Sequence, residues 1–244
     1  MNAVRFDHVS KAFGTRKVLD DLSFEIPQGQ AFCLLGRSGT GKSVALRHII
    51  GLTKADSGRV FVEERDITTL RGRQLADVRK HMGVLFQNAA LFDSMSVGDN
   101  VSFPMHRHTD WGAADIRDRA RANLSAVGLG EEFDTMPGDL SGGMKKRAGL
   151  ARAMALDPPI LLVDEPSAGL DPITAGEIDL LLIKAKQRGA TLVVVTHNIP
   201  SARVLGDGFA VLQDGRMLVS GTLAALEASE EPVVQAFMRS QGGG

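Results

Sequence analysis

The sequence contains very little cysteine and few aromatic residues. Among its 244 residues there are one cysteine, one tryptophan and no tyrosine. Cys33 alone cannot form a disulfide within the chain, and its apolar neighbours favour a buried side chain over a reactive thiol. No window approaches the roughly 18 apolar residues of a membrane-spanning helix, and residues 1–7 lack the apolar region of a signal peptide. We therefore expect a cytoplasmic chain that does not cross a membrane by itself.

A strong charge of one sign is also missing. Lys and Arg number 28 and Asp and Glu number 29, which gives a formal net charge of -1. This balance argues against a dedicated nucleic-acid binder, and we expect no nucleic-acid partner. The hydrophobic content of 43% in a chain of this length is enough for the core of one large domain.

The most informative stretch fits the pattern G-x-x-x-x-G-K-[ST]. It consists of Gly36, Arg37, Ser38, Gly39, Thr40, Gly41, Lys42 and Ser43. An apolar run precedes it and a helical pattern follows, so its glycines lie in a strand-to-helix turn where backbone N–H groups can surround phosphate oxygens. Lys42 would bridge the β- and γ-phosphates of a nucleotide, and the Ser43 hydroxyl would ligate Mg²⁺.

Four polar residues follow apolar runs that we interpret as buried parallel strands. They are Gln87, Asp164, Glu165 and His197. Ligands of open α/β sheets bind beyond the carboxyl ends of the strands, so all four are expected beside the phosphate loop. Asp164 would hold Mg²⁺ and Glu165 would be the general base. His197 would contact the γ-phosphate and hold the attacking water, and Gln87 would touch Mg²⁺ and that water.

The N-terminal part of the chain has alternating patterns. Residues 4–32 predict short antiparallel strands joined by turns. Phe13 lies between two of these strands, where its ring could stack on a base or equally belong to the core. Val18 is expected in the same apolar contact.

The whole chain reads as one α/β domain with a mostly parallel core sheet. Residues 1–87 and 158–221 form this core together with an antiparallel β subdomain. Residues 88–157 lack a convincing long strand and predict an inserted helical subdomain. Residues 222–244 predict a C-terminal helix, over 222–239, and a tail.

A second glycine segment lies in the helical part. Ser141, Gly142 and Gly143 open a predicted helix, and such an arrangement can bind an anion or simply cap the helix. One site has little use for a second phosphate cradle, so this one suggests a nucleotide bound to another subunit.

Taken together, these segments resemble the ATPase subunits of ABC transporters, which are P-loop NTPases with a RecA-like core. The matching residues are 36–43, Gln87, 140–144, 160–165, 167–171 and His197, and the resemblance covers essentially the whole chain. It implies a head-to-tail homodimer with two ATP molecules, each held between one subunit's phosphate loop and the other's Ser141, Gly142 and Gly143. Asp171 would lie at the dimer contact. Phe13 would stack on adenine in place of the commoner tyrosine.

Several stretches are most similar to the ATPases of the Mla and Mce lipid-transport systems. They are residues 83–97, 100–105, 140–152, 196–198 and 231–237. This likeness implies lipid transport, with phospholipid as the expected cargo, and an ATPase on the cytoplasmic face of the inner membrane. The implied partners are a permease dimer received by residues 88–105, an extracytoplasmic MCE-domain lipid-binding protein and an accessory cytoplasmic subunit. Residues 231–239 would assist dimerisation.

Two alternatives stay open. The same motor residues also occur in ABC importers for amino acids or other small solutes. Soluble ABC ATPases of DNA repair or translation are a different class, but they usually carry a coiled-coil insertion or two cassettes, and this chain has neither.

Overall fold

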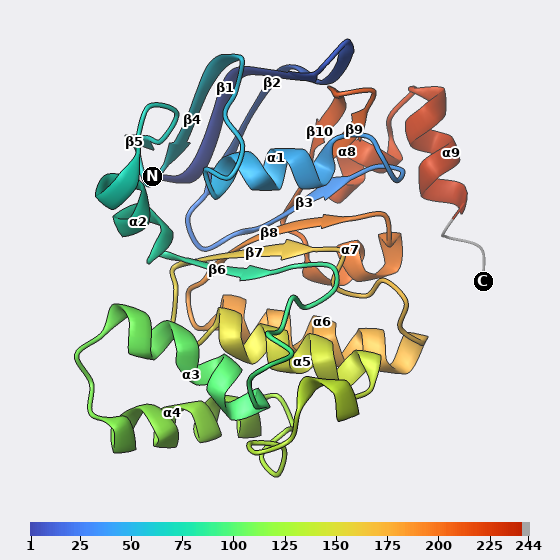
Figure 1. Cartoon of the computed structure of the whole chain (residues 1–244). Helices are drawn as coiled ribbons and strands as arrows, with labels where there is room; N and C mark the ends of the chain where they lie inside the picture. Colours follow the sequence, from blue (N-terminus) through green and yellow to red (C-terminus); the bar gives the residue numbers. More distant parts are fainter. Residues whose placement is uncertain (241–244) are drawn as a thin grey trace.

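The computed structural model describes residues 1–240, and a six-stranded sheet lies at its centre (Figure 1). The strand order is β10-β9-β3-β8-β7-β6. Their bounds are β3 (Ala31–Leu35), β6 (Met82–Leu85), β7 (Ile160–Asp164), β8 (Thr191–Thr196), β9 (Gly208–Gln213) and β10 (Arg216–Gly221). All neighbours are parallel except β9 and β10. Strands β3, β7 and β8 are buried throughout, as their unbroken apolar runs require. The predicted mostly parallel core sheet is confirmed.

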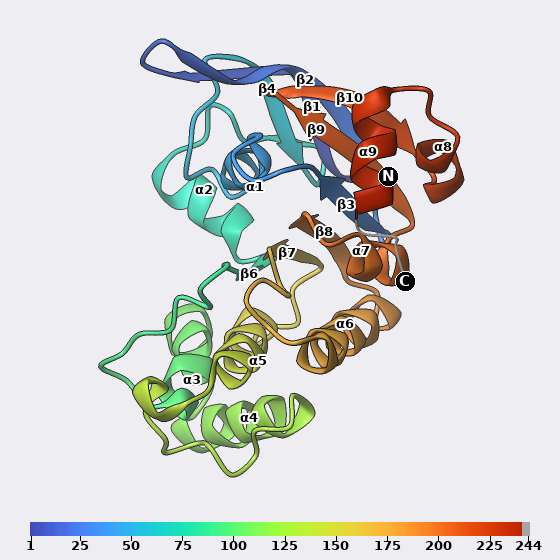
Figure 2. The ribbon, with the colours of Figure 1, turned by 90° about the vertical axis from the view of Figure 1, so that its right-hand side faces the viewer.

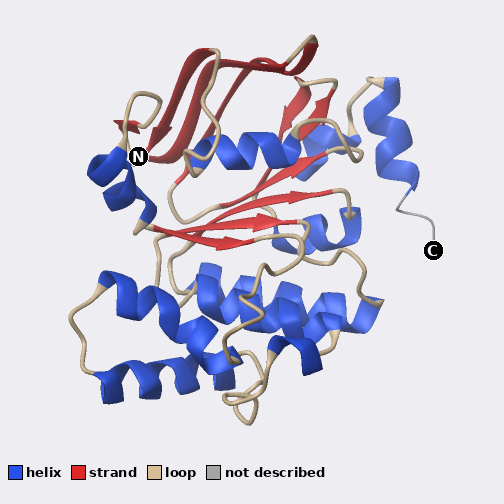
Figure 3. Cartoon of the chain, viewed as in Figure 1, coloured by secondary structure: helices blue, strands red, loops and turns tan. Residues whose placement is uncertain are grey.

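A second, antiparallel sheet covers one side of the core. It contains β1 (Asn2–Phe13), β2 (Arg16–Pro27), β4 (Ser57–Val62) and β5 (Arg65–Asp66), in the order β2-β1-β4-β5. Helix α1 (Lys42–Ile49) lies between the two sheets, and α2 (Gly72–Arg79) lies at their edge (Figure 3). The rings of Phe6, Phe24 and Phe32 stack in sequence, with centroids 4.5 and 5.5 Å apart, and so join the two sheets.

Helices cover the opposite face of the core sheet. They are α5 (Gly142–Ala153), α6 (Pro172–Gln187) and α7 (Ile199–Leu205). Helices α3 (Val97–His108) and α4 (Ala113–Ala126) group with α5 farther from the sheet, and a short 3-10 helix (Pro137–Asp139) leads into α5 (Figure 2). This helical layer has an apolar cluster of its own, which includes Val101, Ile116 and Leu124.

The end of α5 touches β6 backbone to backbone. A Cβ atom added at Gly83 would lie 2.1 Å from the Ala153 carbonyl oxygen, which is closer than any side chain tolerates. A Cβ atom added at Gly149 would lie 3.0 Å from the side chains of Ala89 and Leu85. The last two turns of α5 are therefore fixed on the sheet.

The expectation of one helix over residues 222–239 is wrong. The structure has α8 (Leu223–Glu227) and α9 (Pro232–Ser240), separated by a break. Pro232 causes it, because its ring disfavours a helical Glu231 and it has no N–H to donate to the preceding turn. Helix α9 packs through Val234, Phe237 and Met238. The predicted tail lies outside the described residues from 241 onward, and within residues 1–240 no helix has the length and apolarity to span a bilayer.

Candidate active site

The phosphate loop connects β3 to α1, and three of its glycines adopt positive φ angles. These angles are 152° at Gly36, 81° at Gly39 and 106° at Gly41. A Cβ atom at Gly36 would lie 2.4 Å from Leu212 O, and one at Gly41 would lie 2.6 Å from Val18 O. Both the backbone angle and the lack of space therefore require glycine at these positions.

Lys42 lies inside this loop. Its ammonium group donates to the carbonyls of Gly36, at 2.8 Å, and Arg37, at 3.0 Å. It also lies 3.5 Å from Glu165 Oε1. Burial lowers the pKa of Lys42, and the neighbouring Glu165 carboxylate opposes that shift. A positive charge thus stands where the loop would receive a phosphate.

Ser43 and Asp164 bring two oxygen ligands together. The Ser43 hydroxyl donates to Asp164 Oδ1 at 2.9 Å. Burial raises the pKa of Asp164, and the hydrogen bond from Ser43 opposes the rise. Within residues 1–240 no three His, Cys, Asp or Glu side chains gather as a metal cluster. A small set of oxygen ligands beside a phosphate site fits Mg²⁺, which binds through one or two carboxylates, waters and phosphates.

Glu165 follows Asp164 and has an unusual backbone. Its φ of 47° lies in the left-handed region, which costs a non-glycine residue about 1 kcal/mol or more. Its carboxylate oxygen Oε2 accepts from the Thr196 hydroxyl at 3.2 Å and from the His197 N–H at 3.3 Å. His197 Nδ1 lies 2.9 Å from the same oxygen. The carboxylate is therefore held in one orientation by residues at the end of β8.

A cavity of about 340 Å³ joins most of the predicted residues. Its lining includes Phe13, Val18, Gln87, Glu165 and His197, together with Ser38, Gly39, Gly41, Lys42 and Ser43. Phe13 ends β1 with 51% of its surface exposed, so the core alternative for this ring does not hold. Gly36, Arg37 and Thr40 line a second hollow on the other side of the loop, against α9.

Asp164 does not line the cavity but is bonded to Ser43, which does. A further group of predicted residues lies away from both the cavity and the phosphate loop: Ser141, Gly142, Gly143 and Asp171. Ser141 caps α5 by accepting from the Met144 N–H at 3.3 Å. Asp171 caps α6, and the hydrogen bond from the Thr174 hydroxyl is the largest cause of its lowered pKa. A Cβ atom at Gly143 would lie 2.6 Å from Thr174 Cγ2, so the two helix starts are neighbours. Together they form a separate surface of this chain.

The sequence did not point to three residues of the site. Arg16 lines the cavity and donates to Gly39 O at 3.3 Å. Thr196 binds Glu165, and its place directly before His197 was an available signal. Lys146 donates to the Glu165 carbonyl at 2.9 Å, but a lysine in a helix of mixed polarity gives no sequence signal of burial.

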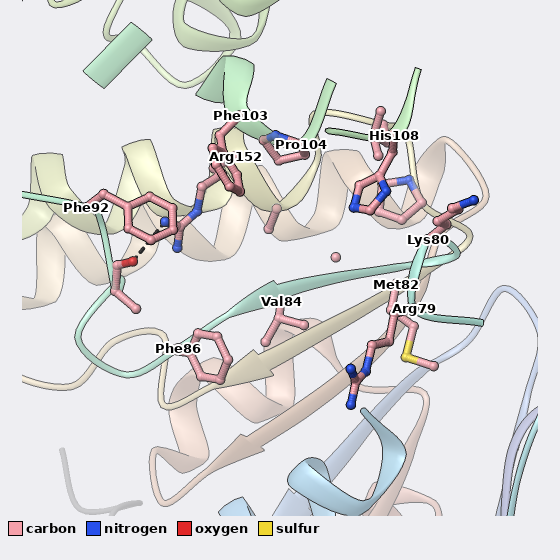
Figure 4. Close-up of a pocket in the computed structure, with 15 residues that line it drawn as sticks. Arg79, Lys80, Met82, Val84, Phe86, Phe92, Phe103, Pro104, His108 and Arg152 are labelled. Carbon is pink, nitrogen blue, oxygen red and sulfur yellow. Dashed lines mark hydrogen bonds between the residues drawn. The ribbon is translucent and has the colours of Figure 1, made fainter. Parts of the chain in front are cut away.

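A separate groove of about 450 Å³ lies between β6 and the helical layer (Figure 4). Its apolar lining includes Met82, Val84, Phe86, Phe92, Phe103 and Pro104. The Phe92 and Phe103 rings lie 5.1 Å apart and are 44% and 39% exposed. Arg79, Lys80 and His108 also line it, and burial together with the charges of Lys80 and Arg107 lowers the pKa of His108. The groove therefore combines an exposed apolar surface with several basic side chains.

Comparison with protein families gives a match to the ABC transporter family over residues 19–168. A probable ribonucleotide transport ATP-binding protein, mkl, of Mycobacterium leprae is 40% identical, over 98% of this chain and 69% of its own length. The intermembrane phospholipid transport ATP-binding protein MlaF of Escherichia coli K12 is 38% identical, over 97% of this chain and 88% of its own length. The methionine import protein MetN of Bradyrhizobium diazoefficiens is 37% identical, over 96% of this chain and 70% of its own.

Solved structures agree with the sequence matches. The cassette MJ0796, in a dimeric post-hydrolysis structure with ADP and phosphate, superposes with a TM-score of 0.84 and 31% identity. The superposition covers 90% of this chain and 98% of that one. The shared fold therefore extends over nearly the whole length of a nucleotide-bound cassette.

Proposed function

We propose that this chain, which belongs to the ABC transporter family as an ATP-hydrolysing subunit, drives the transport of lipid, chiefly phospholipid, through a separate permease. The observation that carries the lipid assignment is the 38% identity to MlaF over 97% of this chain. The name of mkl points to ribonucleotides instead, but residues 83–97 and 196–198 resemble the Mla and Mce lipid systems. The identity to MlaF, together with the character of these stretches, favours lipid.

The geometry supports a definite assignment of roles in hydrolysis. The Glu165 carboxylate takes the proton of the attacking water as the water oxygen bonds to the γ-phosphorus, and the bond to ADP breaks. His197 and Gln87, which line the same cavity, position that water, and Lys42 stabilises charge on the phosphates. Ser43, Asp164 and Gln87 would hold Mg²⁺, which when bound neutralises phosphate charge. Phe13 and Val18 would contact the adenine.

The separation of the two helix starts from the cavity supports a homodimer. Ser141, Gly142, Gly143 and Asp171 do not line the cavity of their own chain. A second copy, placed head to tail, would supply them to the nucleotide bound by this loop. The dimeric cassette with bound ADP and phosphate is a related precedent at 31% identity.

The groove beside β6 is the proposed permease contact. Apolar side chains exposed in a groove suit a short helix with an apolar face, and Phe92, Phe103 and Pro104 belong to the expected segment 88–105. In this proposal residues 88–157 act as a helical signature subdomain on the cytoplasmic face of the inner membrane. An MCE-domain lipid-binding protein and an accessory cytoplasmic subunit complete the assembly.

Purification of the native complex tests the lipid assignment. We expect a permease and an MCE-domain protein to co-purify with this chain, and lipid extraction with mass spectrometry to recover phospholipid. Addition of ATP to the complex in vesicles should move labelled phospholipid, and Glu165→Gln should stop this movement. A complex with a solute-binding protein and no MCE-domain protein would remove the lipid claim.

Import of an amino acid is the second candidate, because of the identity to MetN. The same purification separates the two candidates. In an importer, ATP hydrolysis by the complex would respond to a solute-loaded binding protein and not to phospholipid.

A further inference from the structure

A buried lysine on α5 contacts the backbone of the proposed general base. Lys146 is 5% exposed, and its ammonium group donates to the Glu165 carbonyl at 2.9 Å. Within residues 1–240 its side chain makes this one hydrogen bond and no ion pair. Burial lowers the pKa of Lys146, and the negative charges of Asp164 and Glu165 oppose that shift. Burying an ammonium group without an ion pair costs free energy, so we expect this hydrogen bond to have a role that explains why the lysine is there.

The accepting carbonyl belongs to a residue whose backbone is constrained on both sides. The Glu165 N–H donates to Val195 O at 2.8 Å, and its carbonyl also accepts from the Ala168 N–H at 3.2 Å. In the part of the chain that the structure describes, Lys146 therefore supplies the one side-chain hydrogen bond to this backbone, which is in the left-handed conformation with φ of 47°. The orientation of that backbone determines where the carboxylate meets His197.

Lys146 also ties two functional segments together. It lies five residues after Ser141, which is about 7.5 Å along the helix. In the proposed dimer the start of α5 faces the nucleotide of the partner chain. The second turn of the same helix carries Lys146, which binds Glu165 of its own chain. A shift of α5 when the partner's nucleotide binds would reach Glu165 through this hydrogen bond.

We propose that Lys146 is a positioning residue for hydrolysis, which fixes the backbone of Glu165 and links it to the start of helix α5. This inference rests on the proposed role of Glu165 as the general base. It assigns to Lys146 no contact with the nucleotide.

Substitutions of Lys146 test the proposal in the full-length protein. Lys146→Met removes the donor at similar side-chain length and should lower kcat at least tenfold, while KM for ATP stays within twofold. Lys146→Arg keeps a charged donor and should restore kcat to within threefold of the wild type. Lys146→Gln keeps a shorter, neutral donor and should fall between them. Lys184→Met, an exposed lysine on α6, is the matched control and should leave kcat unchanged.

A double substitution shows whether Lys146 acts through Glu165. If it does, Lys146→Met should not slow the residual hydrolysis of Glu165→Gln any further. An equal fold-loss on both backgrounds would overturn the proposal, as would a wild-type kcat for Lys146→Met or no rescue by arginine. If Lys146→Met does not fold, the kcat of Lys146→Arg is compared with that of Lys146→Gln. Equal kcat values for these two variants would overturn the proposal. Near-normal hydrolysis by Glu165→Gln alone would instead overturn the role of Glu165.

Discussion

At the scale of single residues, Glu165 is fixed by contacts from several elements. Thr196 and His197 at the end of β8 hold its carboxylate, and Lys146 of α5 holds its carbonyl. Lys42 of the phosphate loop approaches the other carboxylate oxygen at 3.5 Å. A carboxylate held in this way is pre-oriented for a water molecule, because little reorganisation is needed during the reaction.

Removal of the Glu165 charge should stop turnover without stopping nucleotide binding. We expect Glu165→Gln to lower kcat by about 100-fold or more, since an amide cannot accept the proton of the attacking water. Measurement of phosphate release, together with gel filtration in ATP, should show a dimer that persists. Glu131→Gln, an exposed matched change, should behave as wild type. Rapid hydrolysis by Glu165→Gln would assign the base to another group.

Cys33 should be unreactive in the folded protein. It lies buried in β3, and burial raises the pKa of its thiol to about 12. Because the thiolate is the reacting form, a thiol reagent at pH 8 should label the native chain at least 100-fold more slowly than the chain in denaturant, an order-of-magnitude estimate. Fast labelling under native conditions would mean that β3 opens locally.

Some of the site residues could be predicted from the sequence and others could not. Lys42, Asp164 and His197 were predictable because loop spacing and strand ends place them by covalent connection alone. Lys146 was not, since its burial depends on which face of α5 turns toward the core sheet, and the polar residues around it in the sequence do not show that face. Phe13 was ambiguous because aromatic residues are common both in cores and in base-binding sites.

At the scale of elements, the starts of α5 and α6 form a surface that is separate from the phosphate loop. Gly143 of α5 packs closely against Thr174 of α6, while Ser141 and Asp171 each cap their own helix. An arginine at Ser141 would obstruct a phosphate approaching this surface. We expect Ser141→Arg to bind ATP at its own loop and to lose at least 90% of hydrolysis, a rough estimate from the loss of one side of a composite site.

Mixed dimers test whether each ATP site is shared between two subunits. Lys42→Ala and Ser141→Arg chains should each be inactive alone, but a mixed dimer contains one complete site. Mixing them should raise hydrolysis to about a quarter of the wild-type rate, because about half of the dimers then contain one intact site of two. Mixing two batches of Lys42→Ala is the control. Failure of mixed dimers to hydrolyse ATP would argue against sites shared between subunits.

The contact between α6 and α7 contains a carboxylate that should make stability depend on pH. Asp179 is 6% exposed, and its Oδ1 has no hydrogen-bond partner within residues 1–240. Burial raises its pKa above the ordinary 3.8, and a hydrogen bond from Ser201 opposes the rise. The folded chain therefore binds this proton more tightly, so stability decreases as the pH rises from 3.8 through the folded pKa.

Asp179→Asn should consequently stabilise the protein at neutral pH. We expect the free energy of unfolding at pH 7 to increase by about 1 kcal/mol, because the charge no longer has to be buried. The gain should disappear below about pH 4, where both side chains are neutral. Urea unfolding at the two pH values measures it, with Asp118→Asn on the exposed face of α4 as control. A loss of stability at pH 7 would show that Asp179 has a favourable partner.

Element boundaries were harder to predict than element types. The strands β1 and β2 each run for 12 residues, although their alternating patterns are shorter. Pairing between them extends both strands beyond the residues that alternate, and register shifts along β1 interrupt the pattern. Pro232 was a readable signal for the start of α9 and for a break before it, because proline is common in the first turn of a helix.

At the scale of the whole molecule, three apolar clusters divide the fold. One lies between the two sheets, one lies between the core sheet and α5, α6 and α7, and the third lies within the helical layer. The first two follow from the long apolar strands, which is why the sequence sufficed to predict the sheet. The packing of α3 and α4 on α5 depends on side-chain shape across distant segments, and it could be expected only as a helical region.

Assembly with the permease should depend on the groove beside β6. A carboxylate in place of Phe103 would have to be desolvated against apolar atoms, so we expect Phe103→Glu to reduce recovery of the permease complex by about tenfold or more. Val204→Glu, at an exposed apolar position on α7, is the matched control. Both variants should keep their melting temperature. Equal recovery of the two complexes would place the permease contact elsewhere.

The close approach between Gly83 and Ala153 has a mechanical consequence. It anchors the last turn of α5 on the edge of the sheet, whereas the first turn, at Ser141, is held mainly by other helices. The 12 residues of α5 span about 18 Å, so a tilt of about 10° around this anchor would move its tip by about 3 Å. In such a tilt the contact at Gly83 would be the pivot of the helix. A methyl group at Gly83 would push the end of α5 away from the sheet and so move this pivot. The displacement of Ser141 would then change although neither nucleotide contact had been altered.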